Sequence, residues 1–137
     1  MCQEKVNDKP TIVIIDDNEI DLMIATKLFY RVNPAICVFS FTTGKEAIAW
    51  LDKKEKCTMS EKMIFLIDIY MPTGNGFQVA KSITQIFKEL NSSLQCYLLS
   101  SSIDYSDKRR IDNQPLISGF CGKPITVEWI KTLLEEM

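Results

Sequence analysis

Short apolar segments rich in β-branched residues alternate with helix-like segments along the chain, and this order most strongly limits its possible folds. The strand-like segments are Thr11–Ile15, Ala35–Phe41, Met63–Asp68, Gln95–Ser100 and Ile117–Gly122. Continuous apolar runs that end at turn-forming residues are typical of strands buried on both faces. Because right-handed crossovers place helices over both faces of a parallel sheet, the pattern predicts a three-layer α/β fold with a five-stranded parallel sheet.

Apolar residues recur at helical spacing between these strands. Helices are expected at Ile20–Arg31, after Thr43, over Phe77–Leu90 and after Thr126. Thr43 and Glu46 have the spacing of a capping box, and Thr126 is a typical N-cap residue. The segment Ile103–Gln114 is nearly all polar and has the weakest helical pattern.

The composition is that of one globular domain. The chain has 137 residues, of which 46% are hydrophobic and 25% charged, and this is enough to bury a real core. We expect a disordered or extended tail over residues 1–9 and a single domain over residues 10–137. The net charge of -2, with interspersed signs, provides no basic stripe for nucleic acid or an anionic membrane. No apolar run is long enough to span a bilayer, and the polar N-terminus has no apolar h-region, so we expect an untargeted protein.

The five cysteines do not form a recognisable metal site. Their number is odd, no CxxC spacing occurs, and the chain contains no histidine. We therefore expect reduced thiols, mostly in the core, and a cytoplasmic protein.

Polar residues stand where the predicted strands end. Asp16 and Asp17 follow the first strand, Asp68 ends the third, Ser100 ends the fourth and Lys123 follows the fifth. The turn-forming residues after Asp68, from Pro72 to Gly76, support its place at a strand end. Ligands of open parallel sheets bind at the carboxyl ends of the strands, so these side chains should converge on one cleft.

Clustered carboxylates repel one another unless a cation neutralises them. Oxygen ligands without Cys or His favour Mg²⁺, which commonly binds one or two carboxylates together with phosphate. A carboxylate can act as nucleophile in phosphoryl transfer, and Asp68 is the candidate. Lys123 and the hydroxyl of Ser100 are suited to hold phosphoryl oxygens.

Each residue also has a purely structural interpretation. Asp16 and Asp17 would suit a helix N-terminus, Asp68 a turn, Ser100 a loop and Lys123 a solvated surface position. Their joint order at the ends of four strands favours a functional site over these separate explanations.

The motifs that carry these residues are I-I-D-D-N, L-I-D-I-Y-M-P-T-G-N-G-F, L-L-S-S-S-I-D and F-C-G-K-P. Together they resemble the response-regulator receiver domain of two-component signalling, over about Pro10 to Glu136. The resemblance implies a flavodoxin-like (βα)5 fold with strand order 2-1-3-4-5. It also implies a phosphoprotein that takes part in signal transduction or a phosphorelay.

The resemblance also assigns roles at the site. It implies that Asp68 accepts a phosphoryl group from a phosphohistidine on a histidine kinase or histidine phosphotransfer protein. Asp17 and Asp68 would bind Mg²⁺ directly, Asp16 mainly through water, and the backbone carbonyl of Tyr70 would complete the protein ligands. Lys123 would pair with the phosphoryl group and precede a cis peptide bond.

The resemblance further implies a conformational switch. Ser100 takes the place of the switch hydroxyl and Phe120 that of the switch aromatic residue. The output surface would be the face of helix four, strand five and helix five, with Tyr105, Lys108 and Arg109 as reporting residues. A solvated helix is the competing interpretation for those three.

Tyr70 is bulky and lies two residues after the phosphoacceptor. It could cover the phosphoryl group against water, with help from Ser102, so we expect slow autodephosphorylation.

Several functions stay open at this stage. The chain ends soon after the predicted last helix, so we expect no output domain and a protein that relays phosphate or binds a downstream target, with a possible phosphorylation-dependent homodimer. The alternative is a degenerate receiver acting as a constitutive protein-binding module. An enzyme such as an aspartyl-phosphate phosphatase is disfavoured because the first acids are adjacent rather than separated by one residue. A flavin-binding module is disfavoured because T-T-G-K-E follows the second strand, and no nucleotide-binding glycine loop occurs.

Overall fold

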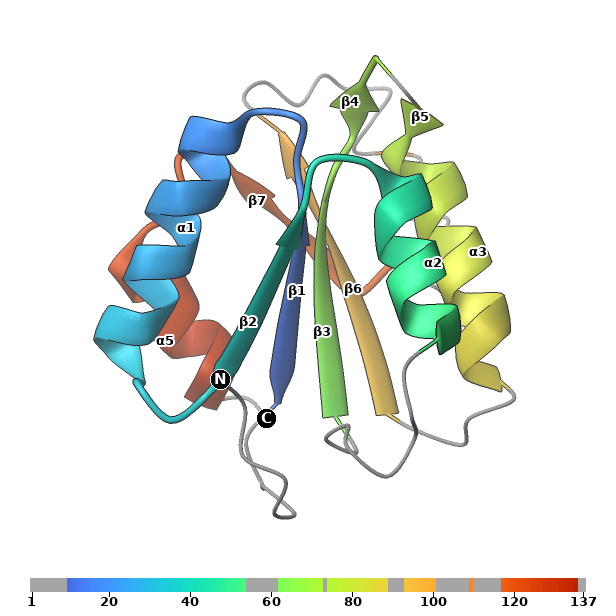
Figure 1. Ribbon diagram of the computed structural model, residues 1–137. Coiled ribbons are helices and arrows are strands. Elements are labelled where there is room, and N and C mark those ends of the chain that lie inside the picture. Colours follow the sequence, from blue (N-terminus) through green and yellow to red (C-terminus); the bar gives the residue numbers. More distant parts are fainter. Residues whose placement is uncertain are drawn as a thin grey trace.

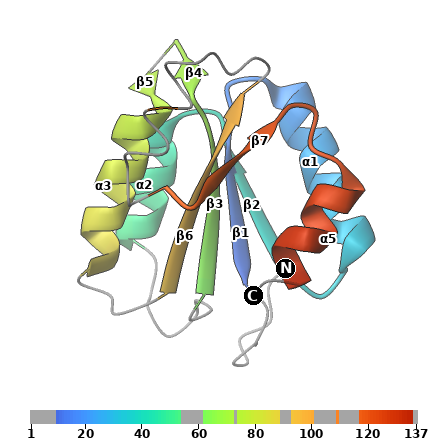
Figure 2. The same cartoon turned by 180° about the vertical axis from the view of Figure 1, so that it is seen from behind.

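The computed structural model describes residues 10–53, 62–72, 74–88, 93–100, 109 and 117–135. Its main sheet consists of β1 (Thr11–Ile15), β2 (Cys37–Phe41), β3 (Lys62–Asp68), β6 (Ser93–Ser100) and β7 (Gly119–Gly122). All neighbouring strands pair in parallel, in the order β2-β1-β3-β6-β7 (Figures 1 and 2). The predicted α/β class is therefore confirmed, and the five strands follow the expected order 2-1-3-4-5 along the sheet.

The labels β4 and β5 belong to a short antiparallel hairpin, Tyr70–Met71 paired with Gly74–Asn75. The turn-forming residues of this stretch predicted only a loop, so the hairpin is a correction. It forms directly after β3, and the N–H of Gly76 closes it by donating to the carbonyl of Ile69 at 2.9 Å.

Helices cover both faces of the sheet. The helices are α1 (Glu19–Val32), α2 (Gly44–Lys53), α3 (Gly76–Lys88) and α5 (Val127–Glu135). Figure 1 shows α1 and α5 together on one face and α2 and α3 on the other. The sequence thus predicted the three layers correctly.

Two strands begin later than the sequence predicted, and for β2 the reason is local. β2 was expected from Ala35, but the Asn33 side chain accepts a hydrogen bond from the N–H of Ala35, and the Asn33 carbonyl accepts one from Ile36. This turn delays the strand to Cys37. β7 begins at Gly119 instead of Ile117, whose side chain is nevertheless buried in the core.

Alternation along the strands divides the core into two halves. The residues of β1 and β3 that face α1 and α5 are Ile12, Ile14, Ile64 and Leu66, and those that face α2 and α3 are Val13, Ile15, Met63, Phe65 and Ile67. All nine are at most 1% exposed. Successive side chains of a strand point to opposite faces, so Asp16 continues the series of Ile14, and Asp68 that of Leu66.

The predicted helix starts are confirmed. The N–H of Glu46 donates to Thr43 Oγ1 at 3.1 Å, which is the N-cap bond of a capping box, and the Thr43 hydroxyl donates to Glu46 Oε1 at 3.1 Å. The N–H of Trp129 donates to Thr126 Oγ1 at 3.1 Å. Asn18 caps α1.

One expectation about the cysteines is wrong. Cys37 is disulfide-bonded, so not all five thiols are reduced. Cys96 and Cys121 are free and buried, as expected for core thiols.

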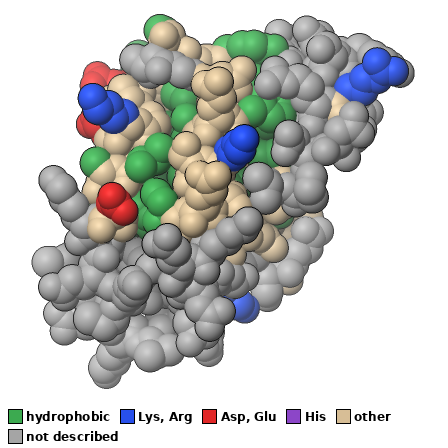
Figure 3. Space-filling model, turned by 90° about the vertical axis from the view of Figure 1, so that its right-hand side faces the viewer, with side chains coloured by type: hydrophobic (Ala, Val, Ile, Leu, Met, Phe, Trp, Pro, Cys, Tyr) green, Lys and Arg blue, Asp and Glu red, His purple; other side chains and the backbone are tan. Residues whose placement is uncertain are grey.

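The remaining expectations concern the surface and the undescribed segments. No described helix has both the length and the apolar character needed to cross a bilayer. On the face that Figure 3 shows, the described Lys and Arg side chains stand apart and form no continuous basic patch. The predicted tail over residues 1–9 lies outside the described residues, as do Ser102, Tyr105 and Lys108. Arg109 is helical and exposed.

Candidate functional site

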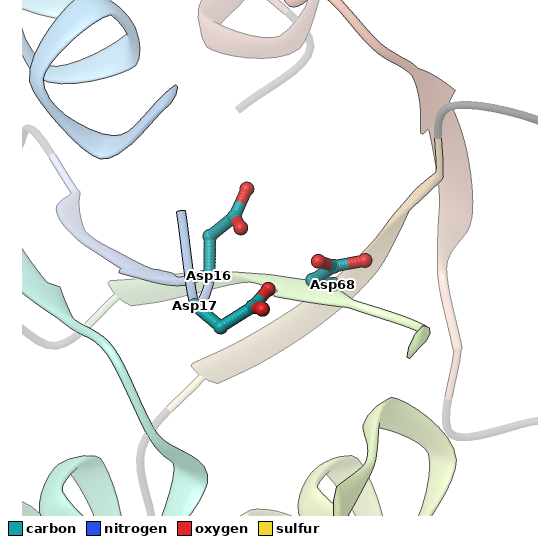
Figure 4. A group of neighbouring side chains, drawn as sticks. All are labelled: Asp16, Asp17 and Asp68. Carbon is teal, nitrogen blue, oxygen red and sulfur yellow. The ribbon is translucent and has the colours of Figure 1, made fainter. Parts of the chain in front are cut away.

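The register of the sheet brings the predicted acidic residues together. Ile15 of β1 pairs with Ile67 of β3, so Asp16 and Asp68 leave neighbouring strands at the same level. One carboxylate oxygen from each of Asp16, Asp17 and Asp68 lies within 4.8 Å of the other two. Figure 4 shows the three side chains at the ends of β1 and β3. The predicted convergence of these acids is therefore observed.

Backbone hydrogen bonds bring the fifth strand's lysine to the same place. Ser100 of β6 pairs with Gly122 of β7, and the N–H of Lys123 donates to the Ser100 carbonyl at 2.8 Å. The peptide bond between Lys123 and Pro124 is cis, which confirms the expectation. Lys123 is thus the first residue after β7, at the start of the loop that leads to α5.

The Lys123 ammonium lies between carboxylates. Its Nζ is 2.5 Å from Asp16 Oδ2, 3.3 Å from Asp68 Oδ2 and 3.4 Å from Asp21 Oδ2. Asp16 is 1% exposed and Asp68 7%, so both belong to the buried floor of the site. Buried charges of this kind are tolerated only when they are paired.

The backbone supports the same carboxylates. Asp16 Oδ1 accepts a hydrogen bond from the N–H of Asn18 at 3.0 Å, and Asp68 Oδ1 accepts one from the N–H of Tyr70 at 3.3 Å. Each of these two acids therefore has one oxygen held by the backbone and the other paired with Lys123.

Burial and charge shift the proton affinities in the site. Burial raises the pKa of Asp68 from 3.8 to about 6, against the lowering effect of Lys123, and the charge of Asp16 adds to the rise. Burial by itself would lower the pKa of Lys123, but its hydrogen bonds and attraction to Asp16 and Asp68 outweigh this and raise that pKa. The carboxylates in the site outnumber its one lysine, so it can accept a further cation.

The donor set suits a hard cation. The three aspartates offer carboxylate oxygens, and an open hollow beside them is lined by Asp17, Ile69, Tyr70, Met71, Pro72 and Asn75. The chain has no histidine, and its two described free thiols are buried in the core. All-oxygen ligands of this kind fit a hard divalent cation such as Mg²⁺.

The other predicted site residues lie at or near this edge. Ser100 ends β6 and is 3% exposed. Phe120 lies on β7 and is 41% exposed, and Tyr70 is 55% exposed beside the hollow that Asp17 lines. Phe120 is therefore turned outward in this structure.

Asp21 is a site residue that the sequence did not indicate. It stands in the first turn of α1, where an acidic residue is ordinarily explained by the helix dipole. Its place in the sequence could have indicated this role. A helix that starts directly after Asp16 and Asp17 has its first turn close to the same strand ends.

The fold and the site together define a flavodoxin-like protein with an acidic, lysine-containing site at the carboxyl edge of its sheet. The family model described as the response regulator receiver domain matches residues 12–135. The chain therefore belongs to the response regulator receiver domain family. No curated protein sequence matches it significantly.

Solved structures of receivers share the fold. A response regulator receiver protein from Dyadobacter fermentans is 23% identical, with a TM-score of 0.79 over 92% of this chain and 95% of its own. A two-component response regulator from Cytophaga hutchinsonii is 24% identical, with a TM-score of 0.77 over 95% and 97%. A third match, at 21% identity and a TM-score of 0.75 over 96% and 90%, comes from a co-crystal of the Saccharomyces cerevisiae histidine phosphotransfer protein Ypd1 with the receiver domain of Ssk1.

Proposed function

We propose that the protein accepts a phosphoryl group on Asp68 from a phosphohistidine of a kinase or phosphotransfer protein and passes the signal to a protein partner. The observation that carries the proposal is the meeting of Asp68, Asp16, Asp17 and Lys123 at one sheet edge. This set also weighs against a degenerate receiver, which would have no use for the buried acids beside the lysine.

The proposed reaction is a transfer between two nucleophiles. A carboxylate oxygen of Asp68 forms a bond to phosphorus as the bond from phosphorus to the imidazole nitrogen breaks, and the imidazole keeps that electron pair. Lys123, 3.3 Å from Asp68, is placed to hold a phosphoryl oxygen by a charge-assisted hydrogen bond. The N–H of Tyr70 orients the Asp68 carboxylate.

The proposed metal is Mg²⁺, held by Asp16, Asp17, Asp68 and the Tyr70 carbonyl. When bound, it would neutralise the clustered carboxylates and stabilise negative charge on the phosphoryl oxygens.

The donor is proposed to dock beside α1. Ile20, Met23 and Ile24 are 65%, 51% and 47% exposed on that helix, and Ile24 shares a hollow with Lys123. Exposed apolar groups of this kind next to a reactive site suit a protein partner with an apolar helix face. The Ypd1–Ssk1 co-crystal named above, which contains a phosphotransfer protein and a receiver, supports this class of partner.

The output is proposed to pass through the face of β7 and α5, with the segment before β7. Phosphorylation would draw Ser100 inward and let Phe120 rotate from its exposed position. A phosphorylation-dependent homodimer through the same face is part of this proposal.

The first test is the intact mass of the protein after incubation with Mg²⁺ and acetyl phosphate. We expect one added phosphoryl group, lost in Asp68→Asn and in a chelator control. A wild type that gains no mass and binds no Mg²⁺ would overturn the proposal in favour of a constitutive binding module.

A second test separates donor docking from chemistry. Met23→Lys should slow transfer from a phosphorylated histidine phosphotransfer protein while leaving acetyl phosphate labelling unchanged. If Met23→Lys and wild type receive the phosphoryl group from the protein donor at equal rates, docking at α1 is ruled out.

A further inference from the structure

Lys123 has a third carboxylate partner that the receiver motifs do not account for. The ammonium offers three N–H donors, and Asp16, Asp68 and Asp21 lie around it. Asp16 and Asp68 come from strand ends, whereas Asp21 comes from α1. Every donor of the lysine thus has a carboxylate within reach before any phosphoryl group arrives.

The cap of α1 holds Asp21 in place. Asn18 Oδ1 accepts hydrogen bonds from the N–H groups of Ile20 at 3.0 Å and Asp21 at 3.1 Å. The Asp21 backbone is therefore fixed at the helix start, and its carboxylate reaches Lys123 at 3.4 Å. Glu19 stands in the same first turn and is exposed, so it shares the favourable effect of the helix dipole.

The lysine borders a hollow on the α1 side. A hollow of about 310 Å³ is lined by Asp16, Asp21, Ile24, Lys123, Pro124 and Ile125, among others. Asp17 and Tyr70 line a different hollow. Asp21 therefore pairs with the ammonium at the hollow on the α1 side, which is not the one that Asp17 and Tyr70 line.

Among the three ion pairs of Lys123, the one with Asp21 costs the least to break. Its side chain is 42% exposed, compared with 2% for Asp16 and 10% for Asp68. An exposed carboxylate can return to water, whereas a buried one that loses its partner is costly.

We propose that Asp21 is a positioning residue that holds Lys123 toward α1 and competes with the phosphoryl group for its ammonium, which slows phosphorylation of Asp68. This inference rests on the proposed function. A phosphoryl oxygen must replace one of the carboxylates on Lys123, and the negative charge of Asp21 also repels an anionic phosphodonor.

The pairing itself is tested without any phosphoryl chemistry. Urea unfolding of wild type, Asp21→Asn, Lys123→Met and the double variant forms a cycle, and a second cycle uses Glu19→Gln. We expect the first cycle to deviate from additivity by about 2- to 5-fold in the unfolding equilibrium constant, and the second to be additive. Additivity in both cycles would overturn the inference. If Lys123→Met does not fold, the ¹⁵N resonance of the Lys123 ammonium provides the test. It should shift in Asp21→Asn and stay unchanged in Glu19→Gln. An unchanged resonance in Asp21→Asn would also overturn the inference.

The competition is tested by the initial rate of labelling with acetyl phosphate. We expect Asp21→Asn to react about 3-fold faster or more, since losing one nearby charge is worth about that factor. Asp21→Glu, which keeps the charge, should restore a rate near wild type, and Glu19→Gln should change it less than Asp21→Asn. Equal effects of Asp21→Asn and Glu19→Gln, or a slower Asp21→Asn, would overturn the competition. If wild type takes up no phosphoryl group while the first cycle shows coupling, the proposed function and the competition fail together and only the ion pair stands.

Discussion

Lys123 Nζ lies 3.3 Å from Asp68 Oδ2, although the two residues are 55 positions apart in the sequence. The same ammonium pairs with Asp16, which is 1% exposed. This one lysine therefore pairs with two buried carboxylates from neighbouring strands.

Replacing Lys123 should destabilise the fold as well as the site. Lys123→Met leaves Asp16 and Asp68 buried without their cation, and we expect a loss of about 2–3 kcal/mol in the free energy of unfolding at neutral pH in metal-free buffer. Urea denaturation measures it. Lys131→Met, at an exposed position of α5, is the matched control and should have little effect. A loss no larger than in that control would mean that the acids do not depend on Lys123.

Asp68→Asn should stabilise the metal-free protein at neutral pH. The pKa of Asp68 is raised from 3.8 to about 6, so the folded state holds this proton more tightly than the unfolded state. Stability is then lost as pH rises between these values, and the Asn variant escapes that loss. We expect a gain of about 1–2 kcal/mol over wild type at neutral pH, which disappears below about pH 4.

Chemical denaturation of wild type and Asp68→Asn between about pH 4 and neutral pH, with a chelator present, measures the sign of the stability difference. Asp52→Asn, on the exposed surface of α2, reports what a surface carboxylate contributes. A difference between wild type and Asp68→Asn that is the same at every pH would contradict the prediction.

A methyl group at Gly76 should disturb the phosphoacceptor. A Cβ there would lie 2.5 Å from the Asp68 carbonyl oxygen and 3.0 Å from the Ile69 Cα, and both are backbone atoms that cannot move aside cheaply. We expect Gly76→Ala to lose about 1–3 kcal/mol of stability and to label more slowly with acetyl phosphate. Gly122→Ala is the control, because a Cβ at Gly122 meets nothing within 4 Å. If both variants behave alike, close packing at Gly76 has no influence on Asp68.

Phe120 should move when Asp68 is phosphorylated. It is 41% exposed here, so an inward rotation would place its ring in a less polar environment. Fluorophenylalanine NMR, with Phe120→Leu to assign the signal, should show a new resonance after acetyl phosphate is added. The resonance should not appear in Asp68→Asn, and an unchanged Phe120 signal in phosphorylated wild type would exclude this switch.

Tyr70 should prolong the life of the phosphorylated form. Tyr70 is 55% exposed beside the hollow that Asp17 lines, where its ring can shield the phosphoryl group from water. We expect Tyr70→Asn to hydrolyse faster than wild type, as followed by the decay of the phosphorylated mass. A half-life that Tyr70→Asn leaves unchanged would contradict this role.

Local patterns in the sequence determined the elements and their order. The apolar runs ending in Asp16 and Asp68 were recognisable because a strand buried on both faces requires continuous apolar residues and a carboxylate must then stand at its end. The caps at Thr43 and Thr126 were recognisable because they depend on neighbours only three residues away. Site residues at strand ends therefore followed from the same reasoning as the strands.

Only the tertiary structure decided which of these residues meet and how closely. The distance between Lys123 and Asp68, the exposed position of Phe120 and the reach of Asp21 to Lys123 depend on register and on helix placement, which link residues far apart in the chain. The hairpin after β3 depends on cross-strand pairs between Tyr70 and Asn75 that a run of turn-forming residues hides. Hydrophobic periods of 2 and 3.6 residues identify single strands and helices in the sequence. The site forms where several of these elements end, and their relative placement is set by tertiary packing.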